Sequence, residues 1–143
     1  MDLTPSIGCF VAIPHEAEFE AVRRAVYEAL EKSGVERVEF VSVSPNRWTS
    51  PSSVTSDIVE RADFVIADVT SQSANVIYEL GIADALRKPK LIMAQHQVPL
   101  PFDLANDQLL LYRPGEETKL TEYLRSWVRD VIERQRQRNV VAS

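Results

Sequence analysis

The sequence predicts an α/β protein built as a three-layer sandwich, with a parallel sheet covered by helices on both faces. Residues 64–67 form a continuous apolar run instead of an alternating one, which is typical of a parallel strand buried on both sides. Such runs alternate along the chain with segments of helical periodicity, and the connections between them are short. A strand, a helix and a strand joined in this way form a right-handed βαβ unit, so we expect a parallel sheet.

The first half of the chain predicts two strands and two helices. Residues 7–13 are apolar almost throughout and predict a central strand. Residues 16–33 carry apolar side chains at spacings of three and four, which predicts an amphipathic helix, and Gly34 suits the left-handed position after its end. Residues 37–43 alternate more and predict an edge strand, and residues 51–61 predict a short helix.

The second half of the chain predicts three strands and two helices. In chain order these are a strand at 64–67, a helix from about 73 to 87, strands at 90–94 and 108–112, and a helix at 116–138. Pro89 ends the first of these helices because its ring disfavours a helical conformation at Lys88. Five strands in this succession predict the flavodoxin-like order 2-1-3-4-5, in which ligands bind beyond the carboxyl ends of the strands.

Composition limits the class of protein. The 143 residues suit a single domain, 1–143, and a formal net charge of −5 gives no support for a nucleic-acid partner. Cys9 is the only cysteine, so no internal disulfide can form and a reducing compartment is expected. No apolar run approaches the roughly 20 residues of a membrane span, and no signal peptide is visible. We therefore expect a cytoplasmic protein without a membrane partner.

The sequence offers no familiar frame for a metal or a phosphate. His15 and His96 are too isolated to predict a metal site. The four glycines form neither a phosphate loop nor a dinucleotide fingerprint, so a bound nucleotide is expected to be held by its base and sugar or by helix N-termini. Gly81 lies inside a predicted helix at a cost of roughly 1 kcal/mol relative to alanine, which predicts the close approach of another backbone.

Glu79 is the first candidate for chemistry. It falls in the second turn of the helix that starts near Ser73, with Asn75 four residues earlier on the same face and Tyr78 beside that face. The helix N-terminus favours anions by about 0.3–1 kcal/mol, which helps to keep this carboxylate ionised. The neighbouring residues are apolar, so Glu79 is either a functional carboxylate or a buried one satisfied by backbone donors or an arginine. Asn75 either points into the site or serves as a late helix cap.

Further candidates follow the ends of predicted strands. Asp68 ends a central strand, where it either contacts a ligand or caps the next turn. Asp63 starts the same strand and is expected to be structural at the opposite edge. His15 and His96 both follow strands at the ligand-binding edge. Trp48, in a loop at residues 44–53, is either a wall for a base or nicotinamide or a cover for the edge of the core.

Three segments together resemble a known family. FVAIP in the first strand, ADFVIADVTSQSANVIYELGIADALRKPKLIM in the middle and PFDL before the fifth strand are similar to the nucleoside 2-deoxyribosyltransferase-like superfamily, and within it to small bacterial TIR-like proteins. The resemblance covers residues 7–112. It implies a flavodoxin-like domain that cleaves the N-glycosidic bond of a nucleoside or nucleotide.

The resemblance also implies roles for single residues. The glutamate of the YELG motif, here Glu79, attacks or stabilises the anomeric carbon, and the aspartate that ends the preceding strand, here Asp68, positions the substrate. Of the family's Asn-Pro-Asn before this helix, the chain keeps only Asn75. The expected substrate contacts are Ile13, Pro14, His15, Trp48, Asn75, Tyr78 and His96. Ile13, Pro14 and His15 stand where the family often has Met-Pro-Phe.

The implied chemistry favours one substrate over others. Cleavage builds positive charge on the sugar, which a fixed carboxylate stabilises, and attack by Glu79 would form a glycosyl-enzyme that water or another base resolves. A purine leaving group needs protonation, whereas the nicotinamide of NAD leaves from a cationic state. We therefore expect NAD or a related nucleotide as the substrate and no cofactor. The alternatives are a nucleoside 2-deoxyribosyltransferase and a non-catalytic nucleotide-binding signalling module.

A second copy of the chain is an expected partner. Deoxyribosyltransferases often complete the site with a polar C-terminal tail from a neighbouring subunit, although this chain ends in VVAS, without a matching tyrosine. The final helix carries an apolar stripe that either packs on the sheet or forms a dimer face. Its members are Leu120, Leu124, Trp127, Val128 and Val131.

Overall fold

A computed structural model describes residues 6–40, 51–100 and 108–142 of the chain. Its five parallel strands form one sheet in the order β2-β1-β3-β4-β5, which confirms the predicted fold class and strand order. The strands are β1 (Gly8–Ala12), β2 (Arg37–Glu39), β3 (Phe64–Asp68), β4 (Lys90–Gln95) and β5 (Gln108–Tyr112). The helices are η1 (Ala17–Phe19), α1 (Glu20–Lys32), α2 (Pro51–Arg61), α3 (Ala74–Ala85) and α4 (Glu117–Ala142).

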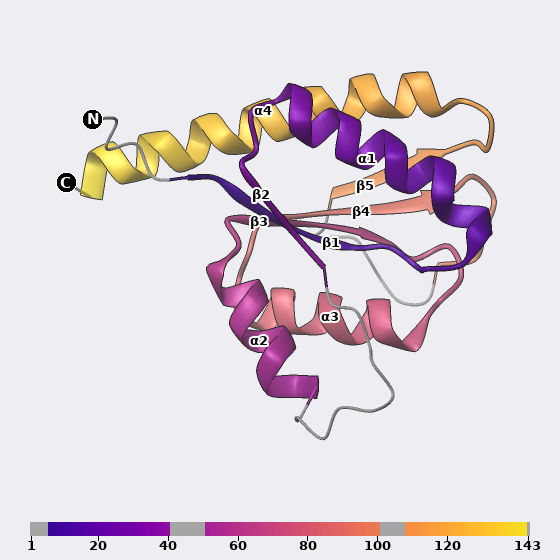
Figure 1. The fold of residues 1–143 in the computed structure, drawn as a ribbon, viewed down its shortest axis with the longest axis horizontal. Coiled ribbons are helices and arrows are strands. Elements are labelled where there is room, and N and C mark those ends of the chain that lie inside the picture. Colours follow the sequence, from indigo (N-terminus) through magenta and orange to yellow (C-terminus); the bar gives the residue numbers. More distant parts are fainter. Residues whose placement is uncertain (1–5, 41–50, 101–107, 143) are drawn as a thin grey trace.

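Helices cover both faces of the sheet. Figure 1 shows α1 and α4 together on one face and α2 and α3 on the other. Alternate residues of β1 supply the two cores: Cys9 and Val11 join the cluster under α1 and α4, and Phe10 and Ala12 join the cluster under α2 and α3. All of these side chains are almost completely buried, as expected for a central parallel strand.

The apolar stripe of α4 packs inside the molecule. Leu120, Leu124, Val128 and Val131 are buried in the core cluster that α4 shares with α1 and the sheet. Trp127 is half-buried, and its ring meets the edge of Phe64 in β3 at a centroid separation of 5.6 Å. Of the two roles considered for this stripe, the structure therefore shows the one on the sheet. None of the helices in the described ranges combines the length and the apolar character that crossing a membrane requires.

Local chain geometry explains where the elements end. Gly34 adopts the predicted left-handed conformation, with φ of 80°. The helix α3 stops at Ala85, two residues earlier than predicted, because Arg87 is left-handed with φ of 56° and Lys88 N bonds back to Ala83 O at 3.0 Å. β2 is shorter than the predicted strand, of which residues 41–43 lie outside the described part.

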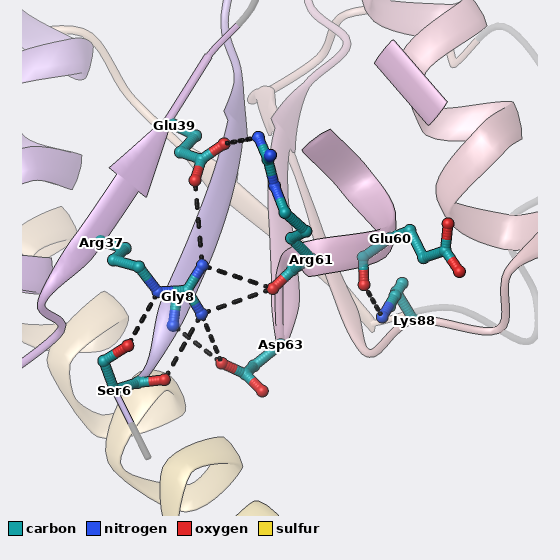
Figure 2. A network of polar contacts seen from close by, with 8 residues as sticks. All are labelled: Ser6, Gly8, Arg37, Glu39, Glu60, Arg61, Asp63 and Lys88. Atoms are coloured by element: carbon teal, nitrogen blue, oxygen red, sulfur yellow. Dashed lines mark hydrogen bonds and ion pairs between the residues drawn. The ribbon is translucent and has the colours of Figure 1, made fainter. Parts of the chain in front are cut away.

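A polar network holds the amino ends of β1, β2 and β3 together (Figure 2). Arg37 Nε donates to Ser6 Oγ at 3.0 Å. Nη1 and Nη2 of Arg37 donate to Arg61 O at 3.5 and 3.4 Å. Asp63 Oδ2 accepts a hydrogen bond of 2.8 Å from Gly8 N and lies 3.7 Å from Arg37 Nη2. Asp63 therefore has the structural role that was predicted, at the edge of the sheet opposite the one where ligand binding is predicted.

Gly8 lies against this network, and a larger residue there requires Arg37 to move. A Cβ built on Gly8 would lie 2.8 Å from the guanidinium carbon of Arg37, so a side chain there pushes the guanidinium away from its partners. We expect Gly8→Ala to lower the free energy of unfolding by about 1 kcal/mol, because the displaced guanidinium loses hydrogen bonds. Urea denaturation measures this change.

The matching control is the same substitution in an Arg37→Ala background. There the methyl group meets no guanidinium, and replacing a strand glycine is expected to be neutral or to stabilise by up to about 1 kcal/mol. Equal effects of Gly8→Ala in the two backgrounds would show that the contact with Arg37 does not constrain this position.

Candidate functional site

A cavity of about 430 Å³ lies between the carboxyl end of β1 and the beginning of α3. The strand order reverses between β1 and β3, and this switch point is where doubly wound sheets bind ligands. The volume of the cavity falls in the range of small-molecule binding sites. The described residues that line it are Ile13, Pro14, His15, Glu16, Ser73, Asn75, Val76 and Glu79.

Glu79 enters the cavity from the second turn of α3. Val76, Leu80 and Ala83 pack the inner side of this helix into the core, and Glu79 lies between them and the cavity. The residue is only 8% exposed. No hydrogen bond or ion pair joins its carboxyl group to another described residue, so neither a backbone donor nor an arginine satisfies it there. The site thus contains a buried carboxyl group that faces open space.

Burial raises the pKa of Glu79 to about 7. The expectation that the helix N-terminus keeps this carboxylate ionised is therefore corrected, because desolvation outweighs the dipole. The dipole effect is at most about 1 kcal/mol and fades beyond the first turn, whereas Glu79 lies in the second. Near neutral pH, both the protonated and the ionised form of Glu79 are therefore populated.

The first turn of α3 forms another wall of the cavity. Ser73 is the N-cap residue, but its side chain makes no capping hydrogen bond. Asn75 lies inside the helix, is exposed and lines the cavity, so it is not the cap. Amide groups of an uncapped first turn and the Asn75 side chain are hydrogen-bonding groups that suit a sugar hydroxyl.

Asp68 is placed differently from Glu79. It is completely buried, and its two carboxyl oxygens accept hydrogen bonds from Thr70 N at 2.9 Å and from Tyr112 Oη at 2.5 Å. Burial raises the pKa of Asp68, and these hydrogen bonds oppose the effect. Thr70 Oγ1 in turn accepts from Gln95 N at 2.9 Å. Asp68 thus ties the carboxyl ends of β3, β4 and β5 together. It does not appear among the described residues that line the cavity, and contact with a substrate stays a prediction.

The remaining expected contacts divide into two groups. Ile13, Pro14 and His15 line the cavity, as β1 ends there. Tyr78 is 47% exposed, and His96 follows β4, where its backbone N bonds to Tyr112 O at 2.7 Å; neither is among the described lining residues. Trp48 lies outside the described residues.

The structure also corrects or extends single expectations. Apart from its own stretch of helix, none of the described residues comes within 4 Å of a Cβ built on Gly81. Among these residues the predicted close approach of another backbone is therefore wrong, and nothing there explains this glycine. Sequence reasoning missed Glu16, Ser73 and Val76 as lining residues. Val76 precedes Glu79 by three positions, and that helical spacing was the available signal. The described residues contain no group of three or more His, Cys, Asp or Glu side chains that could hold a metal ion.

Comparisons with known proteins support the fold. No protein-family model matches the sequence, and no curated protein matches it significantly. The solved CMP N-glycosidase BcmB of Clostridium botulinum is 18% identical with a TM-score of 0.58, over 84% of this chain and 98% of that chain. A flavodoxin-like domain from Synechococcus sp. is 16% identical with a TM-score of 0.55, over 85% and 97%. The TIR domains of the Roq1 resistosome are 14% identical with a TM-score of 0.48, over 64% and 58%.

The pKa of Glu79 predicts how stability depends on pH. The folded protein holds a proton up to pH of about 7, whereas the unfolded chain releases it near 4.5. The free energy of unfolding therefore falls as pH rises from 4.5 to 7, by about 1–3 kcal/mol. Asp68, whose pKa is also raised, adds to the decline. Glu79→Gln should remove the contribution of Glu79 and make the decline shallower, as measured by urea denaturation across that interval.

A matched control is Asp84→Asn on the same helix. Asp84 is exposed and pairs with Lys90 at 2.8 Å, so this variant should keep the decline of the wild type. If Glu79→Gln and the wild type gave parallel stability curves, the carboxyl of Glu79 would not be desolvated in the folded protein.

Proposed function

We propose that this protein cleaves the N-glycosidic bond of NAD or a related nucleotide or nucleoside, with Glu79 as the group that acts on the anomeric carbon. One observation carries the proposal: a buried carboxyl group without a partner among the described residues lines a cavity at the switch point of the sheet. Burying such a group opposes folding, and arrangements of this kind concentrate at functional sites.

The chemistry of the bond fits this carboxyl group. As the bond breaks, the sugar gains positive charge, and an ionised carboxylate close by stabilises that charge more than it stabilises the ground state. The attraction is stronger for a carboxylate as buried as that of Glu79 than it is in bulk solvent. Direct attack by Glu79 forms a glycosyl-enzyme, which water hydrolyses or another base accepts.

The raised pKa of Glu79 favours a cationic substrate. The proton must leave before the carboxylate can act, and a positive charge bound nearby lowers the pKa of a carboxyl group. The nicotinamide riboside portion of NAD carries that charge and releases a neutral base without an acid. A purine needs a proton donor, and the described lining offers only His15 and Glu16 besides Glu79 itself. Cleavage of NAD therefore needs fewer catalytic groups from this site than cleavage of a purine nucleoside does.

Two further findings support the proposal. BcmB, whose fold this chain shares over most of its length, is a CMP N-glycosidase. The YELG segment that resembles the nucleoside 2-deoxyribosyltransferase-like superfamily contains Glu79, the residue that lines the cavity. We infer that the protein is a distant member of that superfamily, similar to its TIR-like hydrolases.

The proposal predicts release of a free base that depends on Glu79. We expect the protein to turn over NAD or another member of a panel of nucleotides and deoxynucleosides. Chromatography of the released base measures this turnover. Glu79→Gln should lower kcat/KM by about two to three orders of magnitude, because an electrostatic stabiliser of the transition state is lost. With wild type, kcat/KM should rise with pH through about 7 as Glu79 ionises.

Asp84→Asn serves as the control variant and should retain full activity, since Asp84 pairs with Lys90 on the surface. Unchanged turnover by Glu79→Gln would remove the proposed role. Base exchange between a deoxynucleoside and a free base, without NAD turnover, would identify a deoxyribosyltransferase. A ligand that raises the melting temperature without any turnover would indicate a binding module.

A further inference from the structure

A second cavity adjoins the Glu79 cavity at the end of β1. It has a volume of about 350 Å³ and lies on the side of the sheet that α1 covers. Ile13 and His15, which follow the end of β1, line both cavities, so the two cavities share a wall there. Its described lining residues are Val11, Ile13, His15, Arg23, Tyr27 and Phe40.

Arg23 is the charged group of this second cavity. Its Nη1 donates to Pro14 O at 2.6 Å, which fixes the guanidinium beside the end of β1. No other hydrogen bond or ion pair of Arg23 is found in the described part of the chain, so most of its five N–H donors remain available. Arg24, the next residue, is instead exposed and pairs with Glu20 at 2.7 Å. Arg23 therefore lines the cavity, whereas Arg24 forms an ion pair on the surface.

Charge divides between the two cavities. The first contains the carboxyl groups of Glu16 and Glu79, whereas the described lining of the second contains Arg23 and no acidic side chain. Tyr27 adds a hydroxyl donor, as any tyrosine does at neutral pH, and burial raises its pKa further. His15 and Phe40 meet edge to face at 6.3 Å and form an aromatic rim. A phosphate group suits the second cavity, and a sugar that gains positive charge suits the first.

We propose that the second cavity binds the phosphate of a nucleotide substrate whose sugar occupies the Glu79 cavity. The substrate lies across Ile13 and His15, with its anionic part on Arg23. This inference rests on the proposed function for the identity of the reacting sugar, and it makes the substrate a nucleotide instead of a nucleoside. It also supplies the phosphate contact that a glycine-rich loop provides in other nucleotide-binding folds.

Binding measurements on Glu79→Gln protein test the pocket without turnover. The probes are matched pairs, measured by calorimetry: cytidine with CMP, and nicotinamide riboside with nicotinamide mononucleotide, and NAD is measured beside them as the dinucleotide. We expect the phosphorylated member of at least one pair to bind more tightly. Arg23→Gln, added to this background, should weaken that binding by about 10- to 100-fold and leave the nucleoside unchanged. If Arg23→Gln weakens the binding of CMP, the pocket accepts a nucleoside monophosphate. If it weakens the binding of NAD alone, the pocket accepts a dinucleotide.

Arg24→Gln in the same background is the matched control and should change none of these affinities. Salt dependence gives a second readout that needs no variant at Arg23: added salt should weaken the binding of CMP and leave the binding of uncharged cytidine unchanged. Three results would overturn the pocket: equal affinity for nucleotide and nucleoside, weakening of both by Arg23→Gln, or no binding of any phosphorylated probe. The second would mean that Arg23 only holds Pro14 in place.

The two proposals fail in different ways. Arg23-dependent binding of a nucleotide, without release of a base by the wild type, would overturn the N-glycosidase function and keep the phosphate pocket. Equal turnover of a nucleoside and its 5′-phosphate would keep the function and overturn the pocket.

Discussion

The burial of one carboxyl group without a partner among the described residues governs the site. α3 must press Val76, Leu80 and Ala83 against the sheet, and Glu79 shares the side of the helix that turns toward β1. Its side chain is therefore taken out of water by the packing of its neighbours, and its pKa rises to about 7. That arrangement opposes folding, but it produces a carboxylate whose attraction for a nearby positive charge is little screened.

The two edges of the sheet differ in how their polar groups are used. At the amino edge, Arg37 forms an ion pair with Asp63 and a hydrogen bond with Ser6, and Asp63 accepts a hydrogen bond from Gly8 N in β1. These contacts hold the strands in register. At the carboxyl edge, Asp68 does similar work with Tyr112, while Glu79 and Arg23 keep donors or acceptors available toward two adjoining cavities. Except for Asp68, the polar groups named here that hold the strands together lie at the amino edge, and those that face a cavity lie at the carboxyl edge.

Local patterns in the sequence predicted much of this. Continuous apolar runs gave the strands and their order, and the spacing of Asn75 and Glu79 placed both on the side of α3 that borders the cavity. Contacts between distant residues were beyond reach. The hydroxyl that satisfies Asp68 comes from Tyr112, 44 positions later, and the role of Arg23 depends on how α1 crosses the end of β1. The pKa of Glu79 likewise follows from the exclusion of water, which spacing alone does not reveal.

A titration of the Glu79 carboxyl group followed by NMR, with isotope-labelled glutamate, tests the central claim most directly. The signal that Glu79→Gln removes identifies the residue. The account predicts a pKa of about 7 in the free protein, because the group is buried without a partner among the described residues. Titration near the ordinary value of 4.5 would mean that water or another residue satisfies the carboxylate, and the basis for its proposed role would be gone.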